Sequence, residues 1–142
     1  MVSLADKPGD VAEITVDSVS SLSQDELRTL YTDMSSTLEN AEQYRDALAK
    51  MLRGIGREIA NIDQGIDINY NKALVDWFTT YQIEADNIRI EQLRKVYRDR
   101  DKTRDNIEKI YVNTIKIIEL AQNNLDIITK TMCKLNCQSQ HN

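Results

Sequence analysis

Apolar residues recur at alternating intervals of four and three along two long stretches of the chain, with a few polar residues in step. The first stretch contains Leu27, Tyr31, Met34, Leu38, Ala41, Arg45, Leu48, Leu52, Ile55, Ile59, Ile62 and Ile66. The second contains Ile90, Leu93, Tyr97, Arg100, Arg104, Ile107, Tyr111, Thr114, Ile118, Ala121, Leu125, Ile128, Met132 and Leu135. We call these two sets the seams. A seven-residue repeat keeps a seam on one side of an under-wound helix, so each predicts a long helix packed against another helix.

The first helix has clear start and stop signals. Ser23 and Glu26 have the spacing of a capping box, in which each side chain accepts a hydrogen bond from the other residue's amide. Leu22 and Leu27 flank the cap as a hydrophobic staple. Gly65 suits a left-handed C-terminal cap, so the sequence predicts a helix from about residue 24 to about residue 62.

The second helix is predicted from about Asp86 to Met132, and its apolar stripe is wider than a two-stranded coil needs. The residues that widen it are Ile110, Ile115, Ile117, Leu120 and Ile127. A wide stripe favours contact with two or three other helices. We therefore expect a homodimer or higher oligomer, or binding to helical segments of other proteins.

Residues 66–87 contain the only Trp and Phe of the chain, at helical spacing with Tyr70, Leu74 and Tyr81. We expect either a short third helix or the first turns of a bent long helix. Trp77, Phe78 and Tyr81 are expected to close one end of the bundle. The alternative is an exposed anchor for another protein, because aromatic residues dominate binding hot spots.

The predicted fold class is all-α, a long antiparallel helical hairpin or coiled-coil bundle over residues 22–135. Residues 1–21 are expected to form a flexible arm, since termini fray unless something holds them. The short alternation of Val11, Ile14, Val16 and Val19 leaves open an extended arm that folds on docking. Residues 136–142 are expected to be a polar tail.

Charge and composition narrow the class of protein. The formal net charge is -5 and the signs are interleaved, whereas a nucleic-acid surface needs concentrated Lys and Arg. We therefore expect no direct nucleic-acid binding. No apolar run reaches the length of a membrane-spanning helix, and the first residues lack the features of a secretory signal. Cys133 and Cys137 fit a reduced pair, so we expect a soluble, intracellular protein, nuclear or cytoplasmic.

The sequence offers little catalytic or metal-binding chemistry. Its one histidine, His141, is in the polar tail, and with Cys133 and Cys137 it matches no familiar zinc spacing. Gly54 and Gly56 lack the strand and helix that surround a phosphate-binding loop. We expect these two glycines to let another helix approach closely, or to weaken the helix that contains them. The chain is predicted not to be an enzyme and to hold no cofactor or metal.

A charged run extends from Arg98 to Asp105 and places Arg100 and Arg104 on the seam, as Arg45 is on the other seam. The run by itself is typical of a solvated, ion-paired face. Polar residues on a seam reduce stability but fix register and partner number. We expect these arginines to pair with acids of a neighbouring helix. The alternative is that they lie at the mouth of a groove that binds an acidic peptide.

Two segments resemble the N-terminal helical domain of the inhibitor-of-growth chromatin proteins. Asp17 to Leu27 is similar to that family's opening segment, and Asn113 to Asp126 is similar to its closing helix. The family's proline is Ser23 here, an extra residue precedes Glu26, and the central region differs. The resemblance implies dimerisation and recruitment of histone-modifying complexes, and it carries over no ligand-binding residue.

We therefore predict a non-catalytic coiled-coil interaction and oligomerisation module, a structural subunit of a larger complex. Two alternatives are a helical-bundle binder of a small apolar ligand and a subunit of a membrane-tether complex. The predicted interaction residues are Leu27, Tyr31, Leu38, Leu48, Leu52, Ile59, Trp77, Phe78, Tyr81, Tyr97, Arg100, Arg104, Ile107, Tyr111, Ile118 and Leu125.

Overall fold

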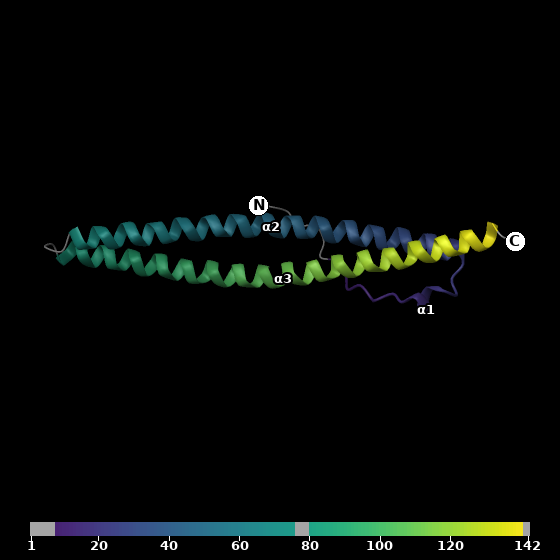
Figure 1. Ribbon diagram of the computed structural model, residues 1–142. Coiled ribbons are helices and arrows are strands. Elements are labelled where there is room, and N and C mark those ends of the chain that lie inside the picture. Colours follow the sequence, from purple (N-terminus) through teal and green to yellow (C-terminus); the bar gives the residue numbers. More distant parts are fainter. Residues whose placement is uncertain (1–7, 76–79, 141–142) are drawn as a thin grey trace. The chain divides into compact units, whose positions relative to one another are not determined.

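The computed structural model describes residues 8–75 and 80–140, and in these ranges it is all-helical with no strand (Figure 1). Helix α1 comprises Val16–Val19, α2 comprises Gln24–Val75 and α3 comprises Thr80–Gln140. The two long helices pack against each other as a hairpin. The predicted all-α hairpin is thus confirmed. The short helix α1 lies in the N-terminal segment and not in residues 66–87, where we expected a possible short third helix.

The start of α2 has the capping geometry that the sequence predicts. The amide of Glu26 donates to Ser23 Oγ at 3.2 Å, and the amide of Ser23 donates to Glu26 Oε1 at 3.3 Å. Two amides that a helix would otherwise leave unpaired are thereby satisfied. Leu22 packs against the cluster that contains Leu27, which is fully buried. The staple therefore ties the start of α2 into the core.

The chain divides into two compact units, and both long helices run through each of them. Unit 1 comprises Met1–Leu48 with Tyr111–Asn142, and unit 2 comprises Ala49–Ile110. In unit 1, Gln24 contacts Asn136, while Ala41 packs with Ile118. In unit 2, Glu58 contacts Arg100. Residue numbers rise along α2 as those of their partners fall along α3, so the helices are antiparallel within each unit.

The N-terminal segment of unit 1, residues 8–22, is packed against both long helices. Asn124 is fully buried, and its side chain holds the backbone of this segment. Asn124 Oδ1 accepts from the amide of Ile14 at 2.9 Å, and Nδ2 donates to the carbonyl of Ala12 at 2.9 Å. Val11 packs against the cluster of Ala41, Ile117 and Ile118.

The structure therefore differs from the flexible arm that we predicted for residues 1–21, at least from Pro8 onward. Val19 is buried beside Leu27 and Ile128, which gives the segment an apolar anchor as well as its hydrogen bonds. Thr15 and Ser18 form a second capping box that starts α1. Val11 and Ile14 correspond to the alternative, an extended arm that docks, whereas Val16 and Val19 belong to helix α1 and Val16 is exposed.

Unit 2 is a plain two-helix coil over its described side chains. Its buried hydrophobic residues are Ile55, Ile59, Ile90 and Ile107. Ile117 and Asn124 of unit 1 are buried on one flank of the α3 seam. The same flank in unit 2 carries Val96 and Thr103, each three heptads before its counterpart, and both are exposed. Nothing in the described part of unit 2 takes the place that residues 8–22 take in unit 1.

The predicted end of the first helix near residue 62 is wrong, because α2 continues to Val75. Gly65 does not adopt the positive φ of a C-terminal cap. A Cβ at Gly65 would lie 3.5 Å from Leu93 Cδ1, an ordinary van der Waals distance, so Gly65 is an interior position of α2 that faces α3. Residues 66–75 therefore extend α2 instead of forming a separate short helix, and residues 76–79 lie outside the described part.

The second helix is also longer than predicted. It begins at Thr80, not near Asp86, and it continues past Met132 to Gln140. Most of the expected polar tail over residues 136–142 is therefore helical. Asn136 contributes to this extension because its Oδ1 accepts from Gln24 Nε2 at 3.3 Å.

We predict that Asn124→Ala releases the N-terminal segment. The change leaves the Ile14 amide and the Ala12 carbonyl without their partner in a buried site, which should lower the free energy of unfolding by about 1–3 kcal/mol. Urea unfolding measures this loss, and hydrogen exchange at the Ile14 amide should accelerate.

The matched control is Asn123→Ala, the exposed neighbour on the same helix. It should leave both measurements close to those of the unaltered chain. Equal exchange rates at Ile14 in the two variants would contradict the clamp.

Candidate interaction surfaces

The seams lie inside the hairpin, where they hold α2 and α3 together. Burial is nearly complete for several of the predicted interaction residues. These are Leu27, Leu48, Ile59, Ile107 and Ile118. In the described chain these five side chains serve contact within the hairpin, so they are not open to a partner.

A second group of predicted residues is only partly covered. Leu38, Leu52, Tyr97, Tyr111 and Leu125 are of intermediate exposure. Tyr31 is on the seam by spacing but is 42% exposed. Partial cover is the expected result of pairing only two helices, because each seam has two flanks and a single partner closes it incompletely.

The three seam arginines have different surroundings. Arg100 Nε lies 3.2 Å from Glu58 Oε2, an ion pair that crosses from α3 to α2 in unit 2. Arg45 instead pairs with its chain neighbour Asp46 at 3.2 Å. Arg104 pairs with Asp101 one turn earlier on α3. Only Arg100 thus has the interhelical acid partner that we expected of all three.

Arg104 also has a donor that is not satisfied by its ion pair. Its Nε is buried and without a hydrogen-bond partner. The Arg104 side chain as a whole is 36% exposed. An unpaired buried donor is costly, and a partner carboxylate or carbonyl at this place would remove that cost.

The aromatic group is mostly outside the described part of the chain. Trp77 and Phe78 fall in residues 76–79, and the side chain of Tyr81 is also not among those described. The predicted choice between a bundle plug and an anchor patch is therefore untested. Near this end of unit 2, the described side chains of Ile68, Tyr70 and Ile88 are all more than half exposed.

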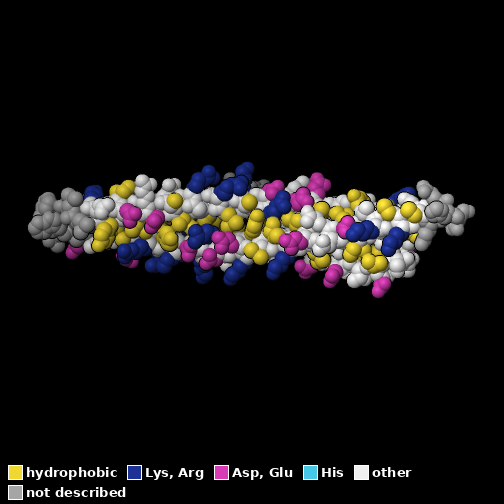
Figure 2. Space-filling view, in the orientation of Figure 1, with side chains coloured by type: hydrophobic (Ala, Val, Ile, Leu, Met, Phe, Trp, Pro, Cys, Tyr) yellow, Lys and Arg dark blue, Asp and Glu magenta, His cyan; other side chains and the backbone are white. Residues whose placement is uncertain are grey.

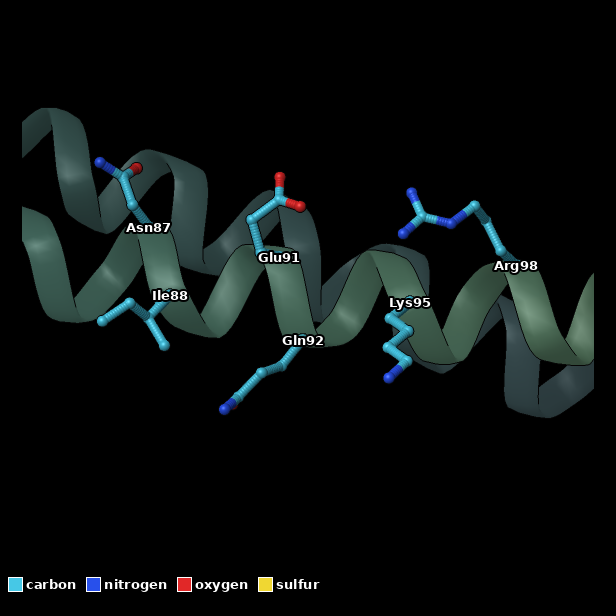
Figure 3. Close-up of a pocket in the computed structure, with 6 residues that line it drawn as sticks. All are labelled: Asn87, Ile88, Glu91, Gln92, Lys95 and Arg98. Carbon is cyan, nitrogen blue, oxygen red and sulfur yellow. The ribbon is translucent and has the colours of Figure 1, made fainter.

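One hollow lies along a single helix and is open to solvent. Its lining residues are Asn87, Ile88, Glu91, Gln92, Lys95 and Arg98, all from α3. Figure 3 shows Ile88, Gln92 and Lys95 projecting from the same side of that helix. Residues of a single helix cannot enclose a ligand, so this hollow is an open surface and not a binding chamber.

The described residues contain no cluster of His, Cys, Asp and Glu that could hold a metal ion. Cys133 and Cys137 are exposed and unbonded. Gly54 and Gly56 have open space where a side chain would be, so neither is in close contact with another helix of this chain. None of the helices described is long and apolar enough to cross a membrane.

Sequence reasoning missed Asn124 as a structural residue. It is adjacent to the seam position Leu125 and carries a side chain that can both donate and accept. The signal that could have found it is an amide next to a seam position, in a chain that also has an alternating apolar segment. Tyr44 was also missed, because it lies beside the α2 seam and not on it. Its side chain is buried.

Comparisons with protein-family models, with curated proteins and with solved structures gave no match for this chain. The resemblance to the inhibitor-of-growth proteins is untested by these comparisons and stays a prediction. The proposed function therefore rests on the surfaces of the structure alone.

We predict a measurable coupling between Arg100 and Glu58. Both side chains are about half exposed, so a double-mutant cycle with Arg100→Gln and Glu58→Gln should give about 0.2–1 kcal/mol at low salt. Urea unfolding of the two single variants and the double variant provides the measurement.

A parallel cycle on Arg94 and Glu91 supplies the control, because that ion pair lies within α3. Adding salt should weaken both couplings. A zero coupling for Arg100 with Glu58 would remove its proposed role in setting the register of the two helices.

Proposed function

We propose that this protein is a non-catalytic coiled-coil interaction module, a structural subunit whose unit 2 is completed by helices from another chain. The observation that carries the proposal is the thin core of unit 2. Of its described side chains, four hydrophobic ones are buried across residues 49–110. Full burial of such a side chain contributes about 1.5–3 kcal/mol, whereas ordering each residue costs about 1–2 kcal/mol.

Further helices would cover the parts of the seam that α2 and α3 leave open. Leu52, Leu93 and Tyr97 are half-buried members of the unit 2 seam, and Val96 is exposed beside them. A third or fourth helix over this flank would bury them, as in three- and four-helix bundles. A second copy of the chain is the first partner to test, because like hairpins associate into symmetric bundles.

The resemblance to the inhibitor-of-growth proteins is in keeping with this proposal, because it also implies dimerisation. It adds an association with histone-modifying complexes, which the described surfaces do not address. We therefore propose a role in assembly. Capture experiments with the assembled oligomer would identify any further partner.

We expect the chain to form a dimer or higher oligomer. Light scattering across a dilution series measures the mass directly, and the mass should fall toward 16.3 kDa only at the lowest concentrations. A well-folded monomer at every concentration would contradict self-association.

A pair of variants locates the surface. Leu93→Ala, in unit 2, removes apolar area from the seam that we propose a partner covers, and it should raise the dissociation constant about tenfold, about 1.4 kcal/mol. Leu125→Ala, at a seam position of similar exposure in unit 1, should leave the dissociation constant nearly unchanged. Equal effects of the two variants would argue against unit 2 as the assembly surface.

A further inference from the structure

One row of residues on α3 lies directly beside the seam at a constant interval of seven. Its members are Val96, Thr103, Ile110, Ile117 and Asn124, and we call them the flank row. Residues seven apart share one side of a coiled-coil helix, so the flank row follows the same side of α3 through unit 2 and unit 1. Three of its five residues are apolar, as expected of a side that another element covers.

The cover of the flank row differs between the two units. Val96, Thr103 and Ile110, in unit 2, are exposed. Ile117 and Asn124, in unit 1, are buried. Unit 2, the teal to green part of Figure 1, has hydrophobic side chains, in yellow, on its surface along the line where its two helices meet (Figure 2). In unit 1 the N-terminal segment takes this place.

The N-terminal segment is held by a small number of contacts. Two hydrogen bonds, both to Asn124, join its backbone to α3. Val19 is its buried apolar anchor. Asp10, Glu13 and Asp17 of the segment form no ion pair among the described residues. The segment can therefore be released by the loss of one anchor, without unpairing the two long helices.

The N-terminal segment also fits α2 incompletely. An open hollow of about 320 Å³ lies between them, lined by the segment near Val11 and by Leu30, Met34 and Thr37 of α2. Leu30 and Met34 are only partly buried. Closely packed interfaces leave few such gaps, so a helix with apolar side chains could make contacts here that the segment does not make.

We propose that the N-terminal segment is an autoinhibitory cover, which occupies on unit 1 the flank that a helix from a second copy of this chain would otherwise take. Its release adds the buried part of the flank row to the assembly surface. The inference rests on the proposed function, in which a second copy covers the exposed part of the same row. A second copy is the occupant because Ile110 and Ile117 continue one register of apolar positions, which a helix with the same repeat can follow.

Asn124 is compatible with a helix as the new cover. Its side chain both donates and accepts, so it can pair with a polar side chain of the partner helix once the segment has left. A buried Asn of this kind fixes register and partner number in coiled coils. The residue that holds the segment would then select one alignment of the two copies.

A substitution within the segment tests the inference in the full chain and leaves α2 and α3 unaltered. Val19→Asp places a carboxylate in an apolar site, so the segment should leave instead of burying the charge. Hydrogen exchange at the Ile14 amide should then accelerate about tenfold or more. The dissociation constant of the oligomer, from sedimentation equilibrium, should fall about tenfold because the uncovered flank adds apolar contact.

Two further variants accompany this test. Val16→Asp is the matched control, since it makes the same change three residues earlier in α1, where the side chain is 56% exposed. It should leave both measurements within about twofold of the unaltered chain. Asn124→Ala removes the two hydrogen bonds instead of the apolar anchor, and it should change both measurements in the same direction as Val19→Asp. Circular dichroism verifies the helix content of each variant.

Ile117→Ala shows whether the uncovered flank makes the new contact. In the unaltered chain the segment covers Ile117, so the substitution should change the dissociation constant less than about twofold. In the Val19→Asp background it should raise that constant about fivefold, because the side chain now contacts the second copy. A tighter assembly that Ile117→Ala does not weaken would place the new contact elsewhere and overturn the inference.

Two other results would also overturn the inference. They are an Ile14 amide that stays protected in Val19→Asp, and a released segment with no tighter association. The proposed function fails in a different way, namely when Leu93→Ala leaves the dissociation constant of the unaltered chain unchanged. An unaltered chain that is monomeric, with a Val19→Asp variant that forms a discrete dimer, would support the autoinhibitory cover and contradict assembly through unit 2.

Discussion

An antiparallel seam with a seven-residue repeat is the constraint on which this fold depends. It pairs early residues of α2 with late residues of α3 and fixes which side chains face inward. A seam between two helices has two open flanks, and burying them requires a third element. The two units differ mainly in what covers those flanks, and less in the seam itself.

In unit 1 the third element is the chain's own N-terminal segment. Asn124 takes the place of an apolar flank residue and satisfies the backbone at Ala12 and Ile14. This arrangement permits non-helical backbone to lie against an apolar stripe without leaving buried polar groups unpaired. Unit 2 has Val96 and Thr103 on that flank, and neither is an amide that could hold an extended segment. A helix, whose backbone groups are satisfied internally, suits that place better.

The sequence predicted the features that depend on local repetition. The seams, the Ser23 and Glu26 capping box and the Leu22 and Leu27 staple all involve residues within a few turns of each other. It did not predict the Ile14 contact with Asn124, which joins residues 110 apart. Gly65 was misread because a glycine that ends a helix and a glycine in the interior of a helix look alike in the sequence. The arginines were misread in part, because only Arg100 has an acid of the other helix within reach.

Affinity and specificity have different sources on these surfaces. A half-covered apolar seam can contribute several kcal/mol of association free energy, but it would accept many apolar helices. Exposed ion pairs contribute little individually, and salt screens them, yet a row of like charges opposed by another such row penalises every wrong partner and register. We therefore expect exposed charges beside the seam to limit which helices the apolar contact of unit 2 accepts.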